Sequence, residues 1–327
     1  MTTDQKLRAP RNRTLFVEVS ESEQLQSRLF VERPHTRFLQ PIEGTINGDF
    51  REWIPLLPAV HVDLLFLDPP YNLNKVFNGR RFSRSSVDDY TAWISEVIER
   101  LLPVLKPTAT VYICGDWLSS QSIFAAASKH FIIRNRITWE REKGRGAKTN
   151  WKNSSEDIWF CTLSDSYTFN VDAVKLRRKV LAPYTDSDGN PKDWTASENG
   201  SFRDTHPSNL WTDITIPFWS MPENTDHPTQ KSEKLLAKLV LASTNPGDFV
   251  FDPFLGSGTT SVVAKKLDRR FLGIEIDTDF CLLAAKRIEM ASKSRQIQGF
   301  ADGVFWERNT LNLQREVNQP DKNGLLF

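Results

Sequence analysis

The chain has 327 residues, and its 42 Lys and Arg against 41 Asp and Glu leave a formal charge of +1, so net charge alone does not point to nucleic acid. This length suits one large α/β domain with an insert, or two modest domains. No apolar run follows the basic residues near the N-terminus, so we expect no signal peptide, and no apolar run approaches the ~20 residues that span a bilayer. The three cysteines and five histidines are dispersed, so we expect a cytoplasmic protein with reduced thiols and no metal site.

The first part of the chain predicts an arm followed by alternating strands and helices. Residues 1–43 are polar and irregular, which is typical of an N-terminal arm. The apolar run at 62–67 has the length of a strand that is buried on both faces. The other expected elements are a short strand at 45–49, an amphipathic helix at 90–102, a strand at 110–114, a helix at 119–129, and strands at 131–139 and 157–161.

The pattern breaks down over residues 164–226, which are rich in Asp, Asn, Ser, Pro and Trp. Three tryptophans, Trp194, Trp211 and Trp219, favour a small folded module there over a disordered insert. Alternation then resumes with a helix at 233–244, a strand at 249–252, a helix at 259–267, a strand at 271–275 and a helix at 278–292. Alternating strands and helices predict an α/β fold with a mostly parallel twisted sheet and helices on both faces.

Basic residues gather in three stretches despite the balanced charge. They are the clusters at 80–84 and 175–179 and a longer stretch, 134–152, in which Trp139 and Trp151 are interleaved. Each cluster alone is typical of a solvated face. Together they favour a surface that follows phosphates and binds more weakly as salt rises.

A glycine turn lies between the expected strand at 249–252 and the helix that follows it. The run from Asp252 through Phe254, Gly256 and Gly258 to Thr259 allows close backbone approach to a ligand at a helix N-terminus. Glu275 ends the next strand, and its spacing suits a carboxylate that accepts both ribose hydroxyls of an adenosine.

Three interpretations of this turn compete. A phosphate-binding loop needs Lys before Ser or Thr, and Thr259 follows Gly258 directly. A dinucleotide fingerprint wants Gly or Ala where Ser261 stands. A plain strand-to-helix turn would explain the glycines alone. Asp252 decides between them, because an acid there repels phosphate yet binds the ammonium of S-adenosylmethionine, a cationic ligand without phosphate.

A second motif, Asp68-Pro69-Pro70-Tyr71, follows the buried strand at 62–67. Ligands bind at the carboxyl ends of strands in such folds. An exocyclic amine is a poor nucleophile, and Asp68 together with the carbonyl of Pro69 would accept its two N–H bonds and stabilise the charge that develops during methyl transfer. Tyr71 offers a stacking face for a base extruded from the duplex. A proline-capped turn without function is the alternative for the Pro pair by itself.

These motifs in this order resemble the β group of the DNA amino-methyltransferases, a permuted group in which the catalytic motif precedes the cofactor motif. The resemblance implies a Rossmann-like methyltransferase fold and covers about residues 46–288. It rests on Gly48-Asp49, Asp63 with Asp68-Pro69-Pro70-Tyr71-Asn72, Trp139 with Glu156-Asp157 and Trp159, His227-Pro228-Thr229-Gln230-Lys231, Asp252 to Thr260, and Gly273 to Glu275.

The resemblance also implies roles for individual residues. Glu275 would bind the ribose of S-adenosylmethionine, and Asp49 would approach its adenine ring. Ser232 departs from the family, which usually has Pro there, so we expect a slightly altered helix start. The methionine end would be lined by Asp252, Phe254, Gly256, Gly258 and Thr259 and covered by the helix that opens at His227, Thr229 and Lys231.

The expected organisation follows from these assignments. Residues 44–163 form the catalytic half of the methyltransferase domain, 227–292 form its cofactor-binding half, and 293–327 form a C-terminal tail. The stretch 164–226 lies where the family carries its target-recognition region. The candidate base-reading residues are Arg177, Arg178, Lys179, Asn199, Arg203 and Asn209.

The expected activity is site-specific methylation of adenine N6 in double-stranded DNA, because in this family Asp at position 68 mostly accompanies adenine and cytosine-N4 enzymes tend to have Ser. Cytosine N4, RNA or a protein amide as the methyl acceptor, and a catalytically silent DNA-binding relative, remain as alternatives. Cytosine C5 chemistry needs a nucleophilic Cys after Pro, which this chain lacks. The resemblance further implies a homodimer and a cognate restriction endonuclease as partners, in a prokaryotic cytoplasm on the nucleoid.

Overall fold

The structure is a computed structural model that describes residues 10–77, 80–82, 84–141, 148–180, 184–197, 200–310 and 314. Lys143, Arg145 and Asn199, which the sequence marked as candidate DNA contacts, lie outside the described residues, as do the side chains of the basic cluster at 80–83. Within these ranges, no helix is both long and apolar enough to cross a membrane.

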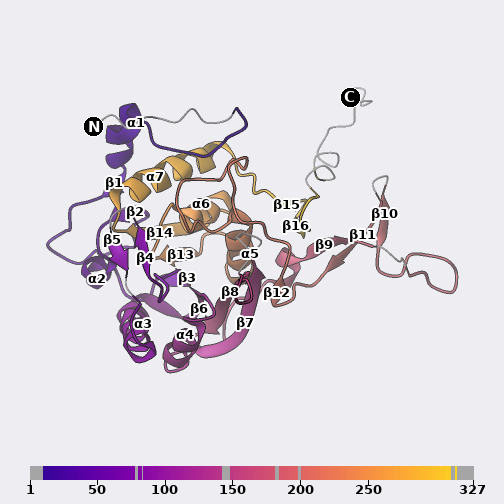
Figure 1. The fold of residues 1–327 in the computed structure, drawn as a ribbon, viewed down its shortest axis with the longest axis horizontal. Coiled ribbons are helices and arrows are strands. Elements are labelled where there is room, and N and C mark those ends of the chain that lie inside the picture. The colour runs from indigo at the N-terminus through magenta and orange to yellow at the C-terminus, as the bar shows by residue number, and fades with distance from the viewer. Residues whose placement is uncertain are drawn as a thin grey trace.

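A large central sheet forms the body of the molecule (Figure 1). Its strands in chain order are β1 (Leu29–Phe30), β2 (Gly44–Asn47), β3 (Val62–Leu67), β6 (Leu105–Gly115), β7 (Ile132–Glu140), β8 (Ser155–Thr162), β12 (Leu210–Trp211), β13 (Phe249–Asp252) and β14 (Arg270–Glu275). Their spatial order is β1-β2-β14-β13-β3-β6-β8-β7-β12. Neighbours pair in parallel except on the two sides of β8, which confirms the predicted mostly parallel sheet.

Helices cover both faces of this sheet, as the sequence predicts. They are α3 (Val87–Leu101), α4 (Ser120–Ala127), α5 (Glu233–Ser243), α6 (Thr259–Lys266) and α7 (Thr278–Lys293). Leu65 and Leu67 of β3 pack into the hydrophobic cluster of α3 and α4, whereas Leu64 and Phe66 pack into that of α5 and α6. Since neighbouring side chains of a strand point to opposite faces, the continuous apolar run of β3 is buried on both.

Side-chain caps fix where three of these helices begin. Ser86 accepts a hydrogen bond from the backbone of Asp89 at 3.0 Å, and Asp277 accepts one from Phe280 at 3.1 Å. Ser232, the departure from the family pattern, is the N-cap of α5, and its hydroxyl accepts from the backbone of Lys234 at 3.2 Å. A serine caps a helix in a way that proline cannot, so the substitution gives α5 a capped start.

One strand begins earlier than expected. The sequence predicts 110–114, but β6 starts at Leu105 and includes Pro107. Its pairing with β3 shifts register between Val62 and Leu64, opposite this proline. Proline is tolerated in a sheet at such an irregularity because it has no N–H to give to the ladder.

A second, smaller sheet extends from the side of the body in Figure 1. It contains β9 (Leu176–Lys179), β10 (Thr195–Ser197), β11 (Gly200–Thr205), β15 (Phe300–Ala301) and β16 (Val304–Trp306), in the order β10-β11-β9-β16-β15. β16 pairs in parallel with β9. Phe305 and Trp306 of β16 are buried. The range expected to be a tail, 293–327, therefore supplies two strands and core residues to the insert.

The N-terminal range expected to be an arm lies against the body. Leu25 of α1 (Val19–Gln26) is buried with Leu282 and Ala285 of α7, and β1 adds an edge strand beside β2. The remaining short elements are α2 (Phe50–Trp53), a 3-10 helix at Ile54–Leu56, the hairpin β4 (Lys75–Phe77) and β5 (Arg80–Phe82), and 3-10 helices at Leu102–Val104 and Val171–Val174.

Candidate active site

A cavity of about 420 Å³ lies at the carboxyl edge of the central sheet, where β2, β3, β13 and β14 end. Because these strands are parallel neighbours, the loops after them meet at one edge. The cavity brings together nearly all of the sequence-predicted site residues, namely Asp49, Asp68, Pro69, Pro70, Tyr71, His227, Thr229, Lys231, Asp252, Phe254, Gly256, Thr259 and Glu275. Gly258 lies outside its lining.

The Asp-Pro-Pro-Tyr motif begins as β3 ends. The Tyr71 hydroxyl donates to Asp68 Oδ1 at 3.0 Å, and Lys231 Nζ donates to Asp68 Oδ2 at 2.6 Å. The hydroxyl of Tyr90 on α3 donates to the carbonyl of Pro70 at 2.9 Å and so fixes the proline turn. Burial, followed by the charge of Asp68, raises the pKa of Tyr71 well above its usual value, so this hydroxyl stays a neutral donor.

Lys231 lies in the catalytic end of the cavity, although the family pattern suggested a place near the methionine. Its side chain is 6% exposed and faces the Asp68 carboxylate and, at 3.5 Å, Glu156 Oε2 on β8. Arg141 pairs with the other oxygen, Glu156 Oε1. Burial lowers the pKa of Lys231, but the charges of Asp68 and Glu156 outweigh this and raise it overall, so the ammonium stays protonated.

The glycine turn needs its two glycines for different reasons. Gly256 has φ +54°, and a Cβ on it would lie 2.9 Å from His227 Nε2 in the cavity wall. Gly258 has φ +87°, and a Cβ there would meet the Cβ of Ala284 on α7 at 2.6 Å. Gly256 thus lets the chain pass close to the cavity, whereas Gly258 allows α6 to begin against α7.

Besides Asp68, the carboxylates that line the cavity include Asp252, Glu275 and Asp49. Asp252 Oδ1 accepts from the backbone of Phe254 at 2.9 Å and Oδ2 accepts from the Thr260 hydroxyl at 2.6 Å, while burial raises the pKa of Asp252 to about 7. Glu275 accepts from the backbone of Gly256 and of Asp277, both at 2.8 Å, and burial also raises its pKa.

The third carboxylate, Asp49, caps α2 and accepts hydrogen bonds from Arg51, which lower its pKa. His227 in the cavity wall is a partly buried base. Burial lowers its pKa to about 4, so the ring is neutral at pH 7. The lining of the cavity is therefore acidic, with Lys231 at its catalytic end and Arg51 at its rim.

Aromatic side chains complete the cavity, and sequence reasoning did not select three of them. Phe50 lies 4.9 Å from Phe254 between ring centroids, and Trp93 of α3 lies 6.3 Å from the same ring. Phe280 packs its ring 4.4 Å from that of His227. Phe50 directly follows the selected Asp49, which was a usable signal. Trp93 had the spacing of a core residue in an amphipathic helix, so its pattern gave no sign of a site.

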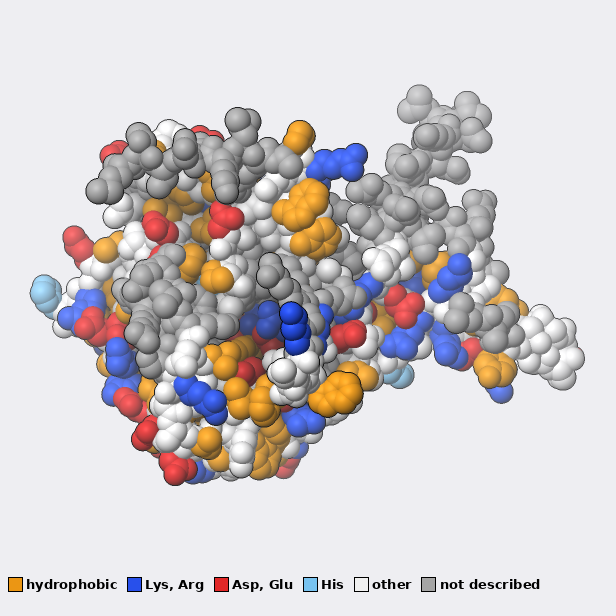
Figure 2. All heavy atoms as spheres, viewed as in Figure 1, with side chains coloured by type: hydrophobic (Ala, Val, Ile, Leu, Met, Phe, Trp, Pro, Cys, Tyr) orange, Lys and Arg blue, Asp and Glu red, His pale blue; other side chains and the backbone are white. Residues whose placement is uncertain are grey.

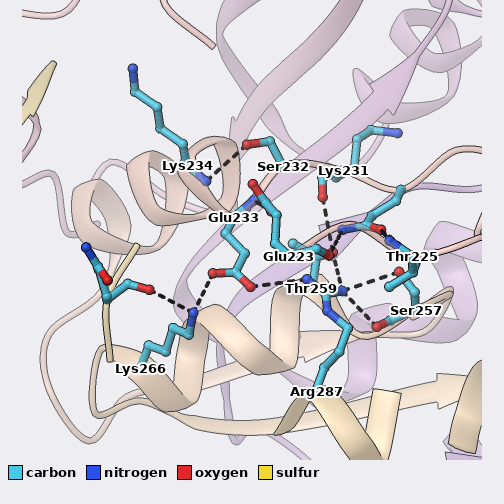
Figure 3. Close-up of polar contacts among 12 residues, drawn as sticks. Glu223, Thr225, Lys231, Ser232, Glu233, Lys234, Ser257, Thr259, Lys266 and Arg287 are labelled. Carbon is cyan, nitrogen blue, oxygen red and sulfur yellow. Dashed lines mark hydrogen bonds and ion pairs between the residues drawn. The ribbon is translucent and has the colours of Figure 1, made fainter. Parts of the chain in front are cut away.

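A buried polar network lies beneath the glycine turn (Figure 3). Arg287 of α7 donates to the carbonyl of Ser257 at 2.8 Å and to the Thr259 hydroxyl at 3.0 Å, and pairs with Glu233 at 3.2 Å. The Thr259 hydroxyl in turn donates to the carbonyl of Lys231 at 3.1 Å. The cofactor turn and the segment that carries Lys231 are therefore held together by hydrogen bonds.

The three arginines among the predicted base-reading residues of the small sheet are paired with carboxylates. Arg177 donates to Asp204 at 2.7 and 2.8 Å, Arg203 donates to Asp193 at 2.8 Å, and Arg178 lies 3.8 Å from Glu307. A further candidate, Asn209, donates to the Asn135 side chain and the carbonyl of Arg136. Figure 2 shows basic and acidic side chains interspersed over this extension.

The fold and the site define a class, the amino-methyltransferases that act on nucleic acid. An Asp-Pro-Pro-Tyr loop and an acidic glycine turn share one cavity at the carboxyl edge of a mostly parallel sheet. A family model described as DNA methylase, for N6 and N4 enzymes, matches residues 62–286. The chain belongs to this N6/N4 DNA methylase family.

Individual relatives agree with this assignment. The chain is 35% identical to DNA adenine methyltransferase YhdJ of Escherichia coli (strain K12) over 264 residues, covering 79% of this chain and 86% of that protein. It is 31% identical to type II methyltransferase M.BglII of Bacillus subtilis, covering 75% of this chain and 68% of that protein. The solved cytosine-N4-specific PvuII DNA methyltransferase shares the fold, with a TM-score of 0.56, 16% identity, and coverage of 78% of this chain and 92% of that one.

Proposed function

We propose that this chain transfers a methyl group from S-adenosylmethionine to the N6 amine of adenine at a specific site in duplex DNA. The observation that carries the proposal is the single cavity that holds both the Asp68 carboxylate and the acidic glycine turn. The family assignment and two relatives named for adenine or type II methylation support the same function.

The cavity residues fit S-adenosylmethionine. The volume of about 420 Å³ is in the range of small-molecule sites. Buried Asp252 and the nearby Glu275 repel phosphates, and each carboxylate oxygen keeps a lone pair for an ammonium or hydroxyl group. Phe50, Phe254 and Trp93 supply flat apolar faces for an adenine ring and a thioether chain. When bound, S-adenosylmethionine supplies an electrophilic methyl group.

The catalytic end of the cavity prepares the amine. Asp68 would accept one N–H of the target amine, and the carbonyl of Pro69 would accept the other. Both contacts concentrate the nitrogen lone pair toward the methyl group and stabilise the positive charge that forms on nitrogen as the N–C bond forms. Tyr71 would hold the extruded base by stacking. The Tyr90 contact to Pro70 keeps this loop rigid.

The same edge of the sheet offers a surface for DNA. β7 runs parallel to β6, so the loop between β7 and β8 leaves the sheet at the edge where the cavity opens. Within this loop Trp151 is 94% exposed, between Lys148 and Lys152 in the sequence. An exposed aromatic among basic residues suits a surface that contacts phosphates and unstacked bases. The insert at 164–226, with β15 and β16, would be the target-recognition module.

A labelling experiment tests this proposal. The chain is incubated with S-adenosylmethionine carrying a labelled methyl group and, in separate reactions, duplex DNA, RNA and protein. We expect label on DNA, released by hydrolysis as N6-methyladenine. Label on RNA or protein instead, or on none of the three, would contradict it.

Two partner proposals rest on the family resemblance. A C2 dimer is the most common oligomer of soluble proteins, and sedimentation showing a monomer at micromolar concentration would contradict a homodimer. The type II naming of M.BglII suits a cognate restriction endonuclease, and a host whose DNA stays uncut after loss of this chain would argue against one. Action on duplex DNA would place the chain at the nucleoid of a prokaryotic cytoplasm.

A further inference from the structure

The two carboxylate oxygens of Asp68, the proposed acceptor of the target amine, are both engaged. Oδ1 accepts from Tyr71 at 3.0 Å, and Oδ2 accepts from the Lys231 ammonium at 2.6 Å. The ammonium is the stronger competitor, because a charge-assisted hydrogen bond is about twice as strong as a neutral one. A base amine that donates to Oδ2 must take the place of this ammonium.

The ammonium also lies at the hydroxyl end of the Tyr71 ring, beside the aromatic face that a base would use. Lys231 Nζ lies 5.5 Å from the centroid of the Tyr71 ring and 3.3 Å from its hydroxyl. The amine of a base stacked on Tyr71 would be expected to donate to Asp68 from beside this ring. Lys231 therefore stands where the substrate amine belongs.

A second acceptor for Lys231 is already in place. Glu156 Oε2 lies 3.5 Å from Lys231 Nζ, and within the described residues this buried oxygen has no hydrogen-bond partner. Arg141 holds the other oxygen of the same carboxylate, so Glu156 is fixed in position. A shift of about one ångström would turn this ion-pair contact into a full hydrogen bond.

Only the side chain of Lys231 is free to make this shift. Its carbonyl accepts from Thr259, which Arg287 holds in the buried network beneath the glycine turn. In Figure 3 the Lys231 backbone faces that network and its side chain points away from it. The backbone is fixed relative to the cofactor turn, and the long flexible side chain can move between two carboxylates.

We propose that Lys231 is a positioning residue that occupies the amine site on Asp68 while no base is bound and moves to Glu156 when the target base enters. This inference rests on the proposed function. Glu156 is then the residue that makes the exchange favourable, since an ammonium leaving Asp68 would otherwise be buried without a full partner. The same arrangement keeps the empty site neutralised, because Asp68 is paired until substrate arrives.

A double-mutant experiment tests the exchange. Glu156→Gln removes the second carboxylate, so Lys231 stays on Asp68 and competes with the base. We expect kcat/KM for DNA to fall about tenfold or more while the Kd for S-adenosylmethionine, measured by calorimetry, changes less than about twofold. Lys231→Met alone removes the competitor, so KM for DNA should fall at least about threefold while kcat does not rise.

The double variant distinguishes the proposed exchange from two independent structural defects. Glu156→Gln with Lys231→Met should be more active on DNA than Glu156→Gln alone, by at least about threefold. Two purely structural defects would add to one another instead. Glu140→Gln is the matched control, because Glu140 is on the adjacent strand β7 and 46% exposed in its contact with Arg308. This control variant should methylate DNA at the wild-type rate.

Three results would overturn the inference. One is a double variant no more active than Glu156→Gln, and another is a higher KM for DNA in Lys231→Met. The third is a Kd for S-adenosylmethionine at least about tenfold weaker in Lys231→Met with Glu156→Gln unaffected, which would make Lys231 a cofactor ligand. Failure of the proposed function itself is distinct, because the wild-type chain would then transfer no methyl group to DNA in the same assay.

Discussion

Charged residues are used differently at the carboxyl edge of the central sheet and in the small sheet. At the edge, the pair Lys231–Asp68 joins segments far apart in the chain, and its side chains are only 6% and 18% exposed. In the small sheet and its neighbouring turns, the pairs lie near the surface. Arg203 and Asp193, for example, keep 40% and 50% of their side chains exposed.

This difference predicts that the methyl-transfer site tolerates substitution of its charged residues less well than the small sheet does. Breaking a buried pair leaves an uncompensated charge and costs about 3–5 kcal/mol, whereas an exposed pair contributes about 1 kcal/mol or less. The methyl-transfer site therefore tolerates little change. The small sheet can exchange its charged residues at small cost in stability, which suits the target-recognition module that we propose for it.

The largest effect is expected at the catalytic carboxylate. Asp68→Ala removes the proposed acceptor of the target amine, and we expect methyl transfer to fall by about a thousandfold or more, because an electrostatic contact made in the transition state is lost. The Kd for S-adenosylmethionine should stay within a few-fold of wild type. Substantial turnover by this variant in a single-turnover methylation assay would refute the acceptor role.

The next largest effect is expected on stability, and it compares a buried pair near the cavity with an exposed pair of the small sheet. Arg287→Met leaves Glu233 with only part of its buried pairing and removes the donor to Ser257 and Thr259, so the free energy of unfolding should fall by about 3–5 kcal/mol. Arg203→Met breaks an exposed pair and should cost about 1 kcal/mol or less. Urea unfolding of both variants measures the contrast. Equal losses would show that burial does not distinguish the two regions.

A smaller effect concerns the cofactor turn. Gly256→Ala places a Cβ 2.9 Å from His227 Nε2 at φ +54°, so S-adenosylmethionine should bind about tenfold more weakly. Gly247→Ala is the matched control, because Gly247 has φ +88° with nothing within 4 Å of the added Cβ. That variant carries the backbone strain without the clash. Similar cofactor binding by both alanine variants would mean that the approach to His227 is unimportant.

The smallest effect is a pH dependence. Burial raises the pKa of Asp252 to about 7, so below pH 7 the carboxyl gains a proton and no longer attracts an ammonium. The affinity for S-adenosylmethionine should fall by about fourfold between pH 8 and pH 6.5. Asp252→Asn should bind weakly with a flat profile, and calorimetry across pH 5.5–8.5 measures both. A wild-type profile as flat as that of Asp252→Asn would exclude this ionisation.

The same shift has the opposite sign for stability. The folded-state pKa of Asp252 lies above its ordinary value of 3.8, so its contribution to the free energy of unfolding is present below pH 4 and is lost as pH rises through 7. The charged form is disfavoured by folding and favoured by the cationic cofactor. Asp252 is thus a buried acid whose ionisation costs stability and serves binding.

Local chemistry explains why the edge of the sheet is predictable. Asp68 through Tyr71 and Asp252 through Thr259 each lie within a few residues of a strand end, so sequence order fixes their place in a parallel sheet. The strands at 62–67 and 249–252 were predicted with their observed limits because each is a short, mostly apolar run next to a motif that marks its end. The cavity then collects residues whose types already indicated the chemistry.

Other features depend on contacts that no local pattern records. β16 pairs with β9 across more than a hundred residues, so the C-terminal range resembled a tail. Lys231 was selected from its motif, but its approach to Asp68 joins residues 163 positions apart. Arg177 and Arg203 resembled DNA contacts in the sequence. Their partners, Asp204 and Asp193, are brought to them by strand pairing and turn geometry, which the sequence does not show.

The identity of the methylated base tests the central claim most directly. DNA from cells expressing the wild-type chain or Asp68→Ala is hydrolysed to nucleosides and analysed by mass spectrometry. The account predicts N6-methyladenine with the wild-type chain, at sites that share one sequence, and none above background with Asp68→Ala. N4-methylcytosine as the product, or N6-methyladenine at equal levels with both chains, would contradict it.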